Sequence, residues 1–416
     1  MIIFAIILGL VAFGVAWYRP SWGACVLLAL LPAYQWRFSV AGVPSTVLEV
    51  VLLAAVIGAG VNWTTKRSAF PRLSPWSIGV ALVWLVIGGL GVAFAQDAYP
   101  ALGLYRAYIV EPLFALPLWI AVWQEERDRR WLLLVISAQL LLFGIVALLQ
   151  RLHVVSGLEP WISESPQRVT SLFSYPNAAA LYAAPLSALL AGILITVQAK
   201  NRLEKTLWII GIIGGIITCA LAYSRGALLA LGIVAIVLGA WSKRRFIWWS
   251  VCAAFIVVLV LIPSTRSKFT NVITMQDTST DVRSVMWQGT WHLLKAHPLT
   301  GAGLGGFPKL YAKYKLPQHV ELLEYPHNIL LNSWVEFGVM GAVFTLGVVF
   351  WLAFALFRRL RTTDFWAVGA LAAWIVVLVH GLVDVPYFKN DLAVLTILLL
   401  VIAAPLVKPD NKIPPA

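Results

Sequence analysis

The stretch WLLLVISAQLLLFGIVALLQ, residues 131–150, carries no charged side chain and is long enough to cross the hydrocarbon core of a bilayer as a helix. Apolar runs of similar character repeat from one end of the 416-residue chain to the other. Hydrophobic residues make up 61% of the chain and charged residues 12%, about half the charged share of a typical soluble domain. The sequence therefore predicts a single all-α integral membrane domain, residues 1–416, with 12 or 13 transmembrane helices.

The predicted spans follow these apolar runs. The second run is short, which leaves open whether it crosses the membrane. The spans cover residues 2–17, 22–34, 46–62, 76–95, 103–123, 131–150, 177–198, 207–222, 226–241, 246–263, 328–356, 366–383 and 390–406.

Basic residues predict how the helices are oriented. They gather in one set of alternate loops, which the positive-inside rule places in the cytoplasm. This set contains Lys66, Arg67, Arg72, Arg127, Arg129, Arg130, Lys200, Arg202, Lys205, Lys243, Arg244, Arg245, Arg358, Arg359, Arg361, Lys408 and Lys412. Most of the net charge of +13 has this origin, so it does not indicate nucleic-acid binding. Residues 151–176, 223–226 and 264–328 then share the outer face of a cytoplasmic (inner) membrane.

Residues 264–328 form the one long polar stretch of the sequence, which predicts chemistry at a single bilayer surface. Apolar residues recur at helical spacing in residues 280–298, so we expect an amphipathic helix on the membrane surface. The run GAGLGG, residues 301–306, matches G-x-G-x-x-G, but neither a strand nor a βαβ unit surrounds it. We interpret it as a turn that lets the backbone approach another element or a phosphate.

Three arginines at the predicted outer face are candidate ligands for an anion. Arg225 lies between two apolar runs, Arg283 lies in the first turn of the loop helix, and Arg168 precedes the seventh span. The dipole of a helix favours an anion at its first turn, and a guanidinium can fork two phosphate oxygens. From the residues alone, alternatives stay open: Arg225 as a side chain that reaches the interface, and Arg283 as an anchor for ordinary membrane lipids.

His327 is the candidate base. It stands at the predicted start of a long span, beside Asn328 and about two turns before Glu336. Neutral imidazole near pH 7 is a suitable base for a sugar hydroxyl, although a lone histidine is more often structural. The sequence has no Walker A, H-E-x-x-H, G-x-S-x-G or paired-aspartate nucleotide-sugar motif. This absence argues against a nucleotide-activated donor and for a donor that is already attached to lipid.

Asn328 and Glu336 are candidates for supporting roles beside His327, and three further polar residues are candidates for the same role. Asn177 follows Pro176 at the mouth of the seventh span, and His380 and Asp384 stand four residues apart near the predicted outer end of a helix. We expect His380 and Asp384 to share one helix face and to pair behind the site. The three cysteines have neither a zinc-site spacing nor a disulfide pattern, so we expect neither a zinc site nor a disulfide framework. We also expect no other metal and no cofactor.

Four motifs in a fixed order resemble the O-antigen ligase/polymerase superfamily of membrane glycosyltransferases. The resemblance covers about residues 165–390, whereas the N-terminal third agrees only in being hydrophobic. The motifs are RVTSLFSYPNAAALYAAPL (168–186), YSRGALLALG (223–232), DVRSVMWQGTWHLLKAHPLTGAGLGGF (281–307) and EYPHNILLNSWVEFGVMGA (324–342).

The resemblance implies a GT-C-like fold with its active site at the outer face of the membrane. It implies that a glycan passes from undecaprenyl pyrophosphate to an acceptor hydroxyl, with inversion and without metal or nucleotide. At the positions that match the motifs, Arg225 and Arg283 would contact the pyrophosphate of the donor, and His327 would activate the acceptor.

The acceptor stays open at this point. Members of the superfamily transfer to a lipid A core sugar in lipopolysaccharide biosynthesis, to a growing polysaccharide, or to a protein serine or threonine. The compact, one-sided loop favours a ligase with a glycan or lipid-linked acceptor. A lipid or polysaccharide transporter is the alternative from another class, but the sequence shows neither the internal repeats nor the midplane charges that a transporter would carry.

Overall fold

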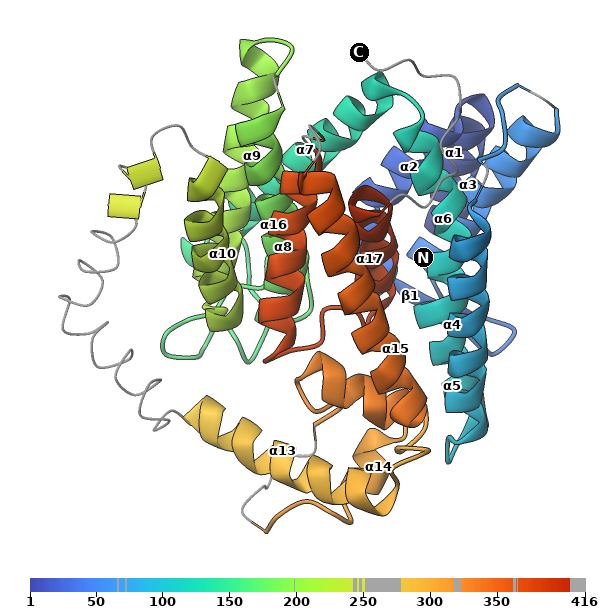
Figure 1. The fold of residues 1–416 in the computed structure, drawn as a ribbon, viewed down its shortest axis with the longest axis vertical. Coiled ribbons are helices and arrows are strands. Elements are labelled where there is room, and N and C mark those ends of the chain that lie inside the picture. Colours follow the sequence, from blue (N-terminus) through green and yellow to red (C-terminus); the bar gives the residue numbers. More distant parts are fainter. Residues whose placement is uncertain are drawn as a thin grey trace.

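The computed structural model describes residues 1–65, 67–71, 73–197, 199–241, 245–246, 249–250, 278–317, 323–361, 364 and 366–404. Seven of its helices are long and apolar enough to cross a membrane, and five shorter helices are also apolar. The prediction of an all-α polytopic membrane protein is confirmed (Figure 1). Most of the predicted span 246–263, the loop residues 264–277 and the basic residues Lys66, Arg72, Lys243, Arg244, Lys408 and Lys412 lie outside the described residues.

The elements follow the apolar runs of the sequence. The helices are α1 (Ile2–Tyr18), α2 (Pro20–Ala29), α3 (Val47–Thr64), α4 (Pro75–Ala93), α5 (Ala98–Tyr105), α6 (Glu111–Trp123), α7 (Glu126–Arg151), α8 (Pro176–Thr196), α9 (Arg202–Leu221), α10 (Arg225–Leu238), α13 (Thr278–Ala296), α14 (Phe307–Tyr311), α15 (Ile329–Leu360), α16 (Trp366–Gly381) and α17 (Asn390–Ala403). Short 3-10 or π segments are η1 (Leu31–Gln35), η2 (Arg106–Val110) and η3 (Gly239–Trp241), and the strands are β1 (Arg37–Val40) and β2 (Val43–Thr46).

The second apolar run, residues 22–34, for which the sequence left a membrane crossing open, is shorter as a helix than a span requires. Helix α2 has only 10 residues, too few to cross a bilayer, and η1 continues the chain through Pro32. A hairpin of β1 and β2 follows, which the all-α prediction did not include. Its two turn residues, Ala41 and Gly42, have φ values of 50° and 81°, the left-handed conformation that two-residue hairpins need.

Helix α8 forms the centre of the bundle, and 83% of its spanning window is buried. Small side chains let neighbouring helices approach it closely, as they do in many membrane bundles. A Cβ atom at Gly192 would lie only 2.6 Å from Cα of Gly369 on α16. Because Pro176 begins this central helix, Asn177 is held near the middle of the molecule at one end of the bundle.

The two groups of loops lie at opposite ends of the bundle, as the predicted orientation requires. At one end, Arg130 on α7 pairs with Glu204 on α9 at 2.9 Å. At the other end, the backbone N–H of Val169 donates to the carbonyl of Leu221 at 3.2 Å. Helix α13 crosses below the spanning helices at this second end in Figure 1, as expected for a helix on the membrane surface. That this end faces away from the cytoplasm stays a prediction.

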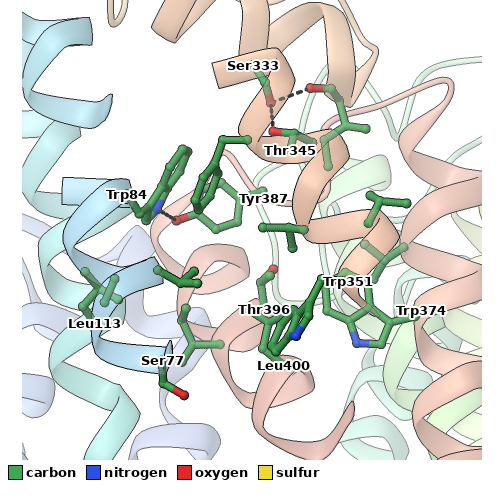
Figure 2. A pocket seen from close by; sticks show the side chains of 18 of the residues that line it. Ser77, Trp84, Leu113, Ser333, Thr345, Trp351, Trp374, Tyr387, Thr396 and Leu400 are labelled. Atoms are coloured by element: carbon green, nitrogen blue, oxygen red, sulfur yellow. Dashed lines mark hydrogen bonds between the residues drawn. The ribbon is translucent and has the colours of Figure 1, made fainter. Parts of the chain in front are cut away.

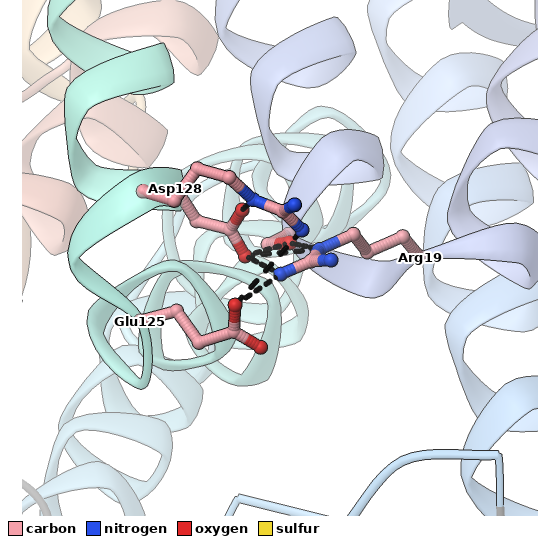
Figure 3. Close-up of polar contacts among 5 residues, drawn as sticks. Arg19, Glu125 and Asp128 are labelled. Atoms are coloured by element: carbon pink, nitrogen blue, oxygen red, sulfur yellow. Dashed lines mark hydrogen bonds and ion pairs between the residues drawn. The ribbon is translucent and has the colours of Figure 1, made fainter.

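A buried carboxylate holds the corner between α1 and α2 against the start of α7 (Figure 3). Asp128 Oδ2 accepts hydrogen bonds from Nε and Nη2 of Arg19, at 3.1 and 2.9 Å, and from the hydroxyl of Ser21 at 2.6 Å. Arg19 also pairs with Glu125. The Asp128 side chain is 3% exposed, so its charge depends on these partners for stabilisation.

We expect Asp128→Ala to lower the free energy of unfolding by about 3 kcal/mol, because Arg19 and Ser21 lose their shared acceptor. Thermal unfolding in detergent measures the change as a fall in Tm. The matched control is Glu126→Gln, which removes an exposed pair with Arg130, where the Glu126 side chain is 64% exposed. That change should cost less than about 1 kcal/mol. Equal Tm values for the two variants would contradict this role of Asp128.

Candidate active site

His327 stands immediately before α15 with a backbone φ of 46°. This left-handed conformation is uncommon outside glycine and is frequent at functional sites. Asn328 fixes the start of the helix, because its Oδ1 accepts from the N–H groups of Leu330 and Leu331, each at 3.0 Å. Its Nδ2 donates to the carbonyl of Leu382 at 3.0 Å. Asn328 is therefore an N-cap that ties the backbone beside His327 to the segment that follows α16.

Four candidate residues form a continuous hydrogen-bonded chain. His327 Nδ1 lies 3.3 Å from Asp384 Oδ1, and Asn177 Nδ2 donates to Asp384 Oδ2 at 3.1 Å. Arg168 Nη2 in turn donates to Asn177 Oδ1 at 3.1 Å. These side chains come from the start of α15, the α16–α17 connection, the start of α8 and the connection before α8. The fold thus forms direct bonds between residues that are up to 207 positions apart in the sequence.

The charge of Asp384 determines which nitrogen of His327 is available. Burial on its own would raise the pKa of Asp384, but the hydrogen bond and charge of His327, the charge of His380 and the N–H of Val385 hold that pKa below its ordinary value. Asp384 is therefore a carboxylate at neutral pH and accepts the proton of Nδ1. In neutral His327 this leaves Nε2 as the nitrogen able to take a proton.

The expected pairing of His380 with Asp384 on one helix face is wrong. Helix α16 ends at Gly381, and Pro386 follows five residues later, so Asp384 lies beyond the helix. The hydrogen bonds of the Asp384 side chain go to His327, Asn177 and the backbone N–H of Val385. His380 instead places Nε2 3.5 Å from the hydroxyl of Ser224, at the limit of a hydrogen bond. Its Nδ1 is buried and has no hydrogen-bond partner within the described ranges.

Arg225 begins α10, at a turn that packs against α16. A Cβ atom at Gly226 would lie 2.7 Å from His380 Cδ2, so only glycine allows this close approach. Tyr223, two residues before Arg225, also has a left-handed backbone, with φ of 51°. This packing holds the N-terminal end of α10, and with it the Cα of Arg225, beside His380.

Arg283 lies on α13. A hydrogen bond connects this helix to Pro326, the residue before His327. Trp287 Nε1 donates to the carbonyl of Pro326 at 2.8 Å. The charge of Arg283 acts on His380, which lies in the bundle. Helix α13 therefore places a cation near the ends of the spanning helices.

The three arginines share one electrostatic neighbourhood. Burial lowers the pKa of Arg168, the charges of Arg225 and Arg283 lower it further, and the charge of Glu164 opposes them. Like charges repel when they are brought together, so the three guanidinium groups make this end of the bundle electropositive. A guanidinium group is planar and carries several N–H donors, a geometry that matches phosphate oxygens.

Glu336, which the sequence placed near His327, bonds to the glycine run instead. Its Oε2 accepts from the N–H of Gly305 at 2.6 Å and so holds the glycine run of residues 301–306 against α15. The same run approaches the end of α4, where a Cβ atom at Gly303 would lie 2.5 Å from Ala95 N. Gly303 has φ of 75°, which favours glycine. The run therefore packs against other elements, one of the two interpretations that the sequence allowed, and Glu336 stabilises it.

An apolar pocket lies among the spanning helices and reaches the first turns of α15, the helix that follows His327 in the sequence (Figure 2). Side chains of α4, α6, α15, α16 and α17 line it, and nearly all of this lining is hydrocarbon. Ile329 and Ser333, in the first two turns of α15, are among its lining residues, as are Trp351 and Trp374. Such a cavity suits an apolar chain. The sequence analysis did not predict it, because its walls come from five separate helices.

Two tyrosines beside the site were also missed. The ring of Tyr325 lies 4.6 Å from the ring of His327, and its hydroxyl lies 3.3 Å from that of Tyr175. Both tyrosines belong to the quoted motifs, Tyr175 before Pro176 and Tyr325 before Pro326. Their position beside these prolines was the only feature in the motifs that pointed to them. A single aromatic residue does not indicate a role until its neighbours in the fold are known.

The sequence of this chain is similar to a known protein family. Residues 210–346 match the family model described as O-antigen ligase. The resemblance to the O-antigen ligase superfamily is thereby confirmed. The matched residues include Arg225, Arg283 and His327, whereas Arg168 and Asp384 lie outside them. A search of curated proteins finds no match to the chain.

Proposed function

We propose that this membrane protein is an O-antigen ligase-like glycosyltransferase. It moves a glycan from undecaprenyl pyrophosphate to an acceptor hydroxyl at the outer face of the cytoplasmic membrane. The observation that carries the proposal is the arrangement at one end of the bundle, where His327 bonded to Asp384 and the cations Arg168, Arg225 and Arg283 gather. The family match supports ligase chemistry of this general kind.

The donor is held by charge at one end and by hydrocarbon contact at the other. Arg225 and Arg283 bind the pyrophosphate, and Arg168 adds a third positive charge. As the glycosidic bond breaks, negative charge grows on the leaving pyrophosphate, and preorganised guanidinium groups stabilise it. The apolar pocket that reaches the first turns of α15 supports a substrate that carries a hydrocarbon tail.

The reaction is a direct displacement at the anomeric carbon. The acceptor hydroxyl oxygen attacks this carbon while its proton passes to Nε2 of His327. The bond between the anomeric carbon and the pyrophosphate oxygen breaks, and its electron pair leaves with undecaprenyl pyrophosphate. Attack opposite the leaving group inverts the configuration. Asp384 keeps the imidazole in the tautomer that accepts the proton and stabilises the imidazolium that forms.

We expect Asp384→Asn to lower kcat by between about 10²- and 10⁴-fold, because an amide can donate to Nδ1 and so favour the wrong tautomer of His327. Steady-state kinetics with lipid-linked glycan measure the loss. The control is Asp97→Asn, which changes an exposed residue that pairs with Lys309 at 3.7 Å. Retention of full kcat by Asp384→Asn would remove the orienting role of the carboxylate.

The function itself is tested with purified protein in lipid nanodiscs, supplied with undecaprenyl-pyrophosphate-linked glycan. We expect release of undecaprenyl pyrophosphate only when an acceptor is added, and a product in which the glycosidic bond is inverted. A panel of lipid A core, polysaccharide and serine- or threonine-containing peptide separates ligase, polymerase and protein transferase. Movement of intact donor across the bilayer without release of undecaprenyl pyrophosphate would indicate a transporter and overturn the proposal.

A further inference from the structure

A second polar group lies near His327 and is reached through the two tyrosines. From the imidazole, ring contact leads to Tyr325, and the hydroxyl of Tyr325 leads to Tyr175. Lys389 Nζ then lies 4.4 Å from the centre of the Tyr175 ring and 4.8 Å from that of Tyr34. An aromatic row therefore joins the candidate base to a buried ammonium group that the proposed mechanism does not use.

This ammonium group lacks the hydrogen bonds that a buried charge normally has. Lys389 Nζ is buried and has no hydrogen-bond partner in the part of the chain that the structure describes. The charge of Asp391 acts on it, but neither oxygen of that buried carboxylate accepts a hydrogen bond of normal geometry there. An unsatisfied buried polar group costs about 1–3 kcal/mol, and a charged one more. Such groups are retained where a ligand or a water molecule completes them.

The two groups together define the chemistry of a suitable ligand. Lys389 offers N–H donors and Asp391 offers acceptors, so a ligand that both donates and accepts satisfies both. A phosphate would be repelled by the negative charge of Asp391, and a cation would be repelled by the positive charge of Lys389. A neutral polyhydroxyl group is repelled by neither charge, and it can accept from and donate to the two groups where Lys389 Nζ lies over the rings of Tyr34 and Tyr175.

We propose that Lys389 and Asp391 bind hydroxyl groups of the acceptor sugar, with the aromatic row leading from this subsite to His327. The acceptor is then a glycan and not a protein side chain. This inference rests on the proposed function, because it assigns the acceptor to the same site. Lys389 and Asp391 act in acceptor recognition and take no part in proton transfer.

The test measures sugar binding by saturation-transfer NMR with the full chain in nanodiscs. The probes are glucose, galactose and N-acetylglucosamine, with glucose 6-phosphate as the anionic comparison. We expect at least one neutral sugar to bind the wild-type protein more tightly than the sugar phosphate does when saturating inorganic pyrophosphate occupies the arginine site. Lys389→Met, which keeps the length of the side chain, should weaken that binding by about 10- to 100-fold, and Asp391→Asn should weaken it as well. Lys309→Met, at a side chain that is 66% exposed, is the control and should change nothing.

Binding of inorganic pyrophosphate, measured on the same samples, separates this inference from the proposed function. Pyrophosphate binding depends on Arg225 and Arg283, so Lys389→Met and Asp391→Asn should retain it, which also shows that both variants are folded. Wild-type protein that binds none of the neutral sugars, or variants that bind them as well as wild type does, would overturn the acceptor subsite and leave the donor site standing. Wild-type protein that binds sugar but no pyrophosphate would instead count against the proposed function.

Discussion

His327→Asn is expected to reduce glycan transfer by between about 10²- and 10⁴-fold, the usual contribution of a positioned general base. Asparagine is the sharpest replacement because it tolerates the left-handed backbone, with φ of 46°, that most residues resist. An asparagine amide can also donate to Asp384, yet it cannot take a proton from the acceptor. The variant therefore removes the chemistry and spares the fold. Rates of undecaprenyl pyrophosphate release in nanodiscs measure the effect.

The matched control for this prediction is His297→Asn. His297 follows the end of α13, and its Nε2 lies 3.1 Å from the hydroxyl of Tyr314. It thus belongs to the same end of the molecule without belonging to the proposed machinery. Transfer by His297→Asn should stay within about twofold of wild type, since most of the catalytic loss requires a group at the reacting atoms. Wild-type turnover by His327→Asn would exclude proton abstraction by this residue.

Arg225→Ala and Arg283→Ala are each expected to lower kcat/KM by about 10²- to 10³-fold, the loss typical of removing one donor that stabilises transition-state charge. Lysine at either position should restore only part of the activity, because an ammonium group keeps the charge but cannot fork two phosphate oxygens. The Kd for undecaprenyl pyrophosphate should rise in the alanine variants as well, since the same groups bind the product.

Arg151→Ala is the control for these two variants. Arg151 ends α7 at the same end of the bundle, is exposed, and donates to Gln167 at 3.1 Å. It tests whether any cation at this end of the bundle supports the reaction through general attraction of an anionic lipid. If Arg151→Ala loses as much activity as Arg283→Ala, the specific donor site is contradicted in favour of a diffuse surface charge.

Much of the fold could be predicted from the sequence, because long apolar runs permit few alternatives. Helix α7 at Glu126–Arg151 contains the run from which the prediction started. The short α2 and the hairpin after it could not be predicted, because a 13-residue apolar run looks the same whether it spans or turns. Basic residues separated the loops into two groups, and the structure places these groups at opposite ends.

The candidate residues of the site could be chosen from the sequence, but the hydrogen bonds between them could not. Motif order singled out Arg225, Arg283 and His327, and the position of Arg168 before α8 singled out a third cation. The bond from His327 to Asp384 depends on where α16 ends, and helix ends are the least certain part of a sequence-based prediction. Glu336 looked like a neighbour of His327 along the helix, yet it turns to the glycine run, a contact that only tertiary packing determines.

The most direct measurement is a structure of His327→Asn in nanodiscs with undecaprenyl-pyrophosphate-linked glycan bound. We predict that the guanidinium groups of Arg225 and Arg283 contact phosphate oxygens of the donor, with the anomeric carbon of the first sugar facing residue 327. A donor whose diphosphate lies away from both arginines, or whose anomeric carbon is separated from residue 327 by protein, would contradict the account.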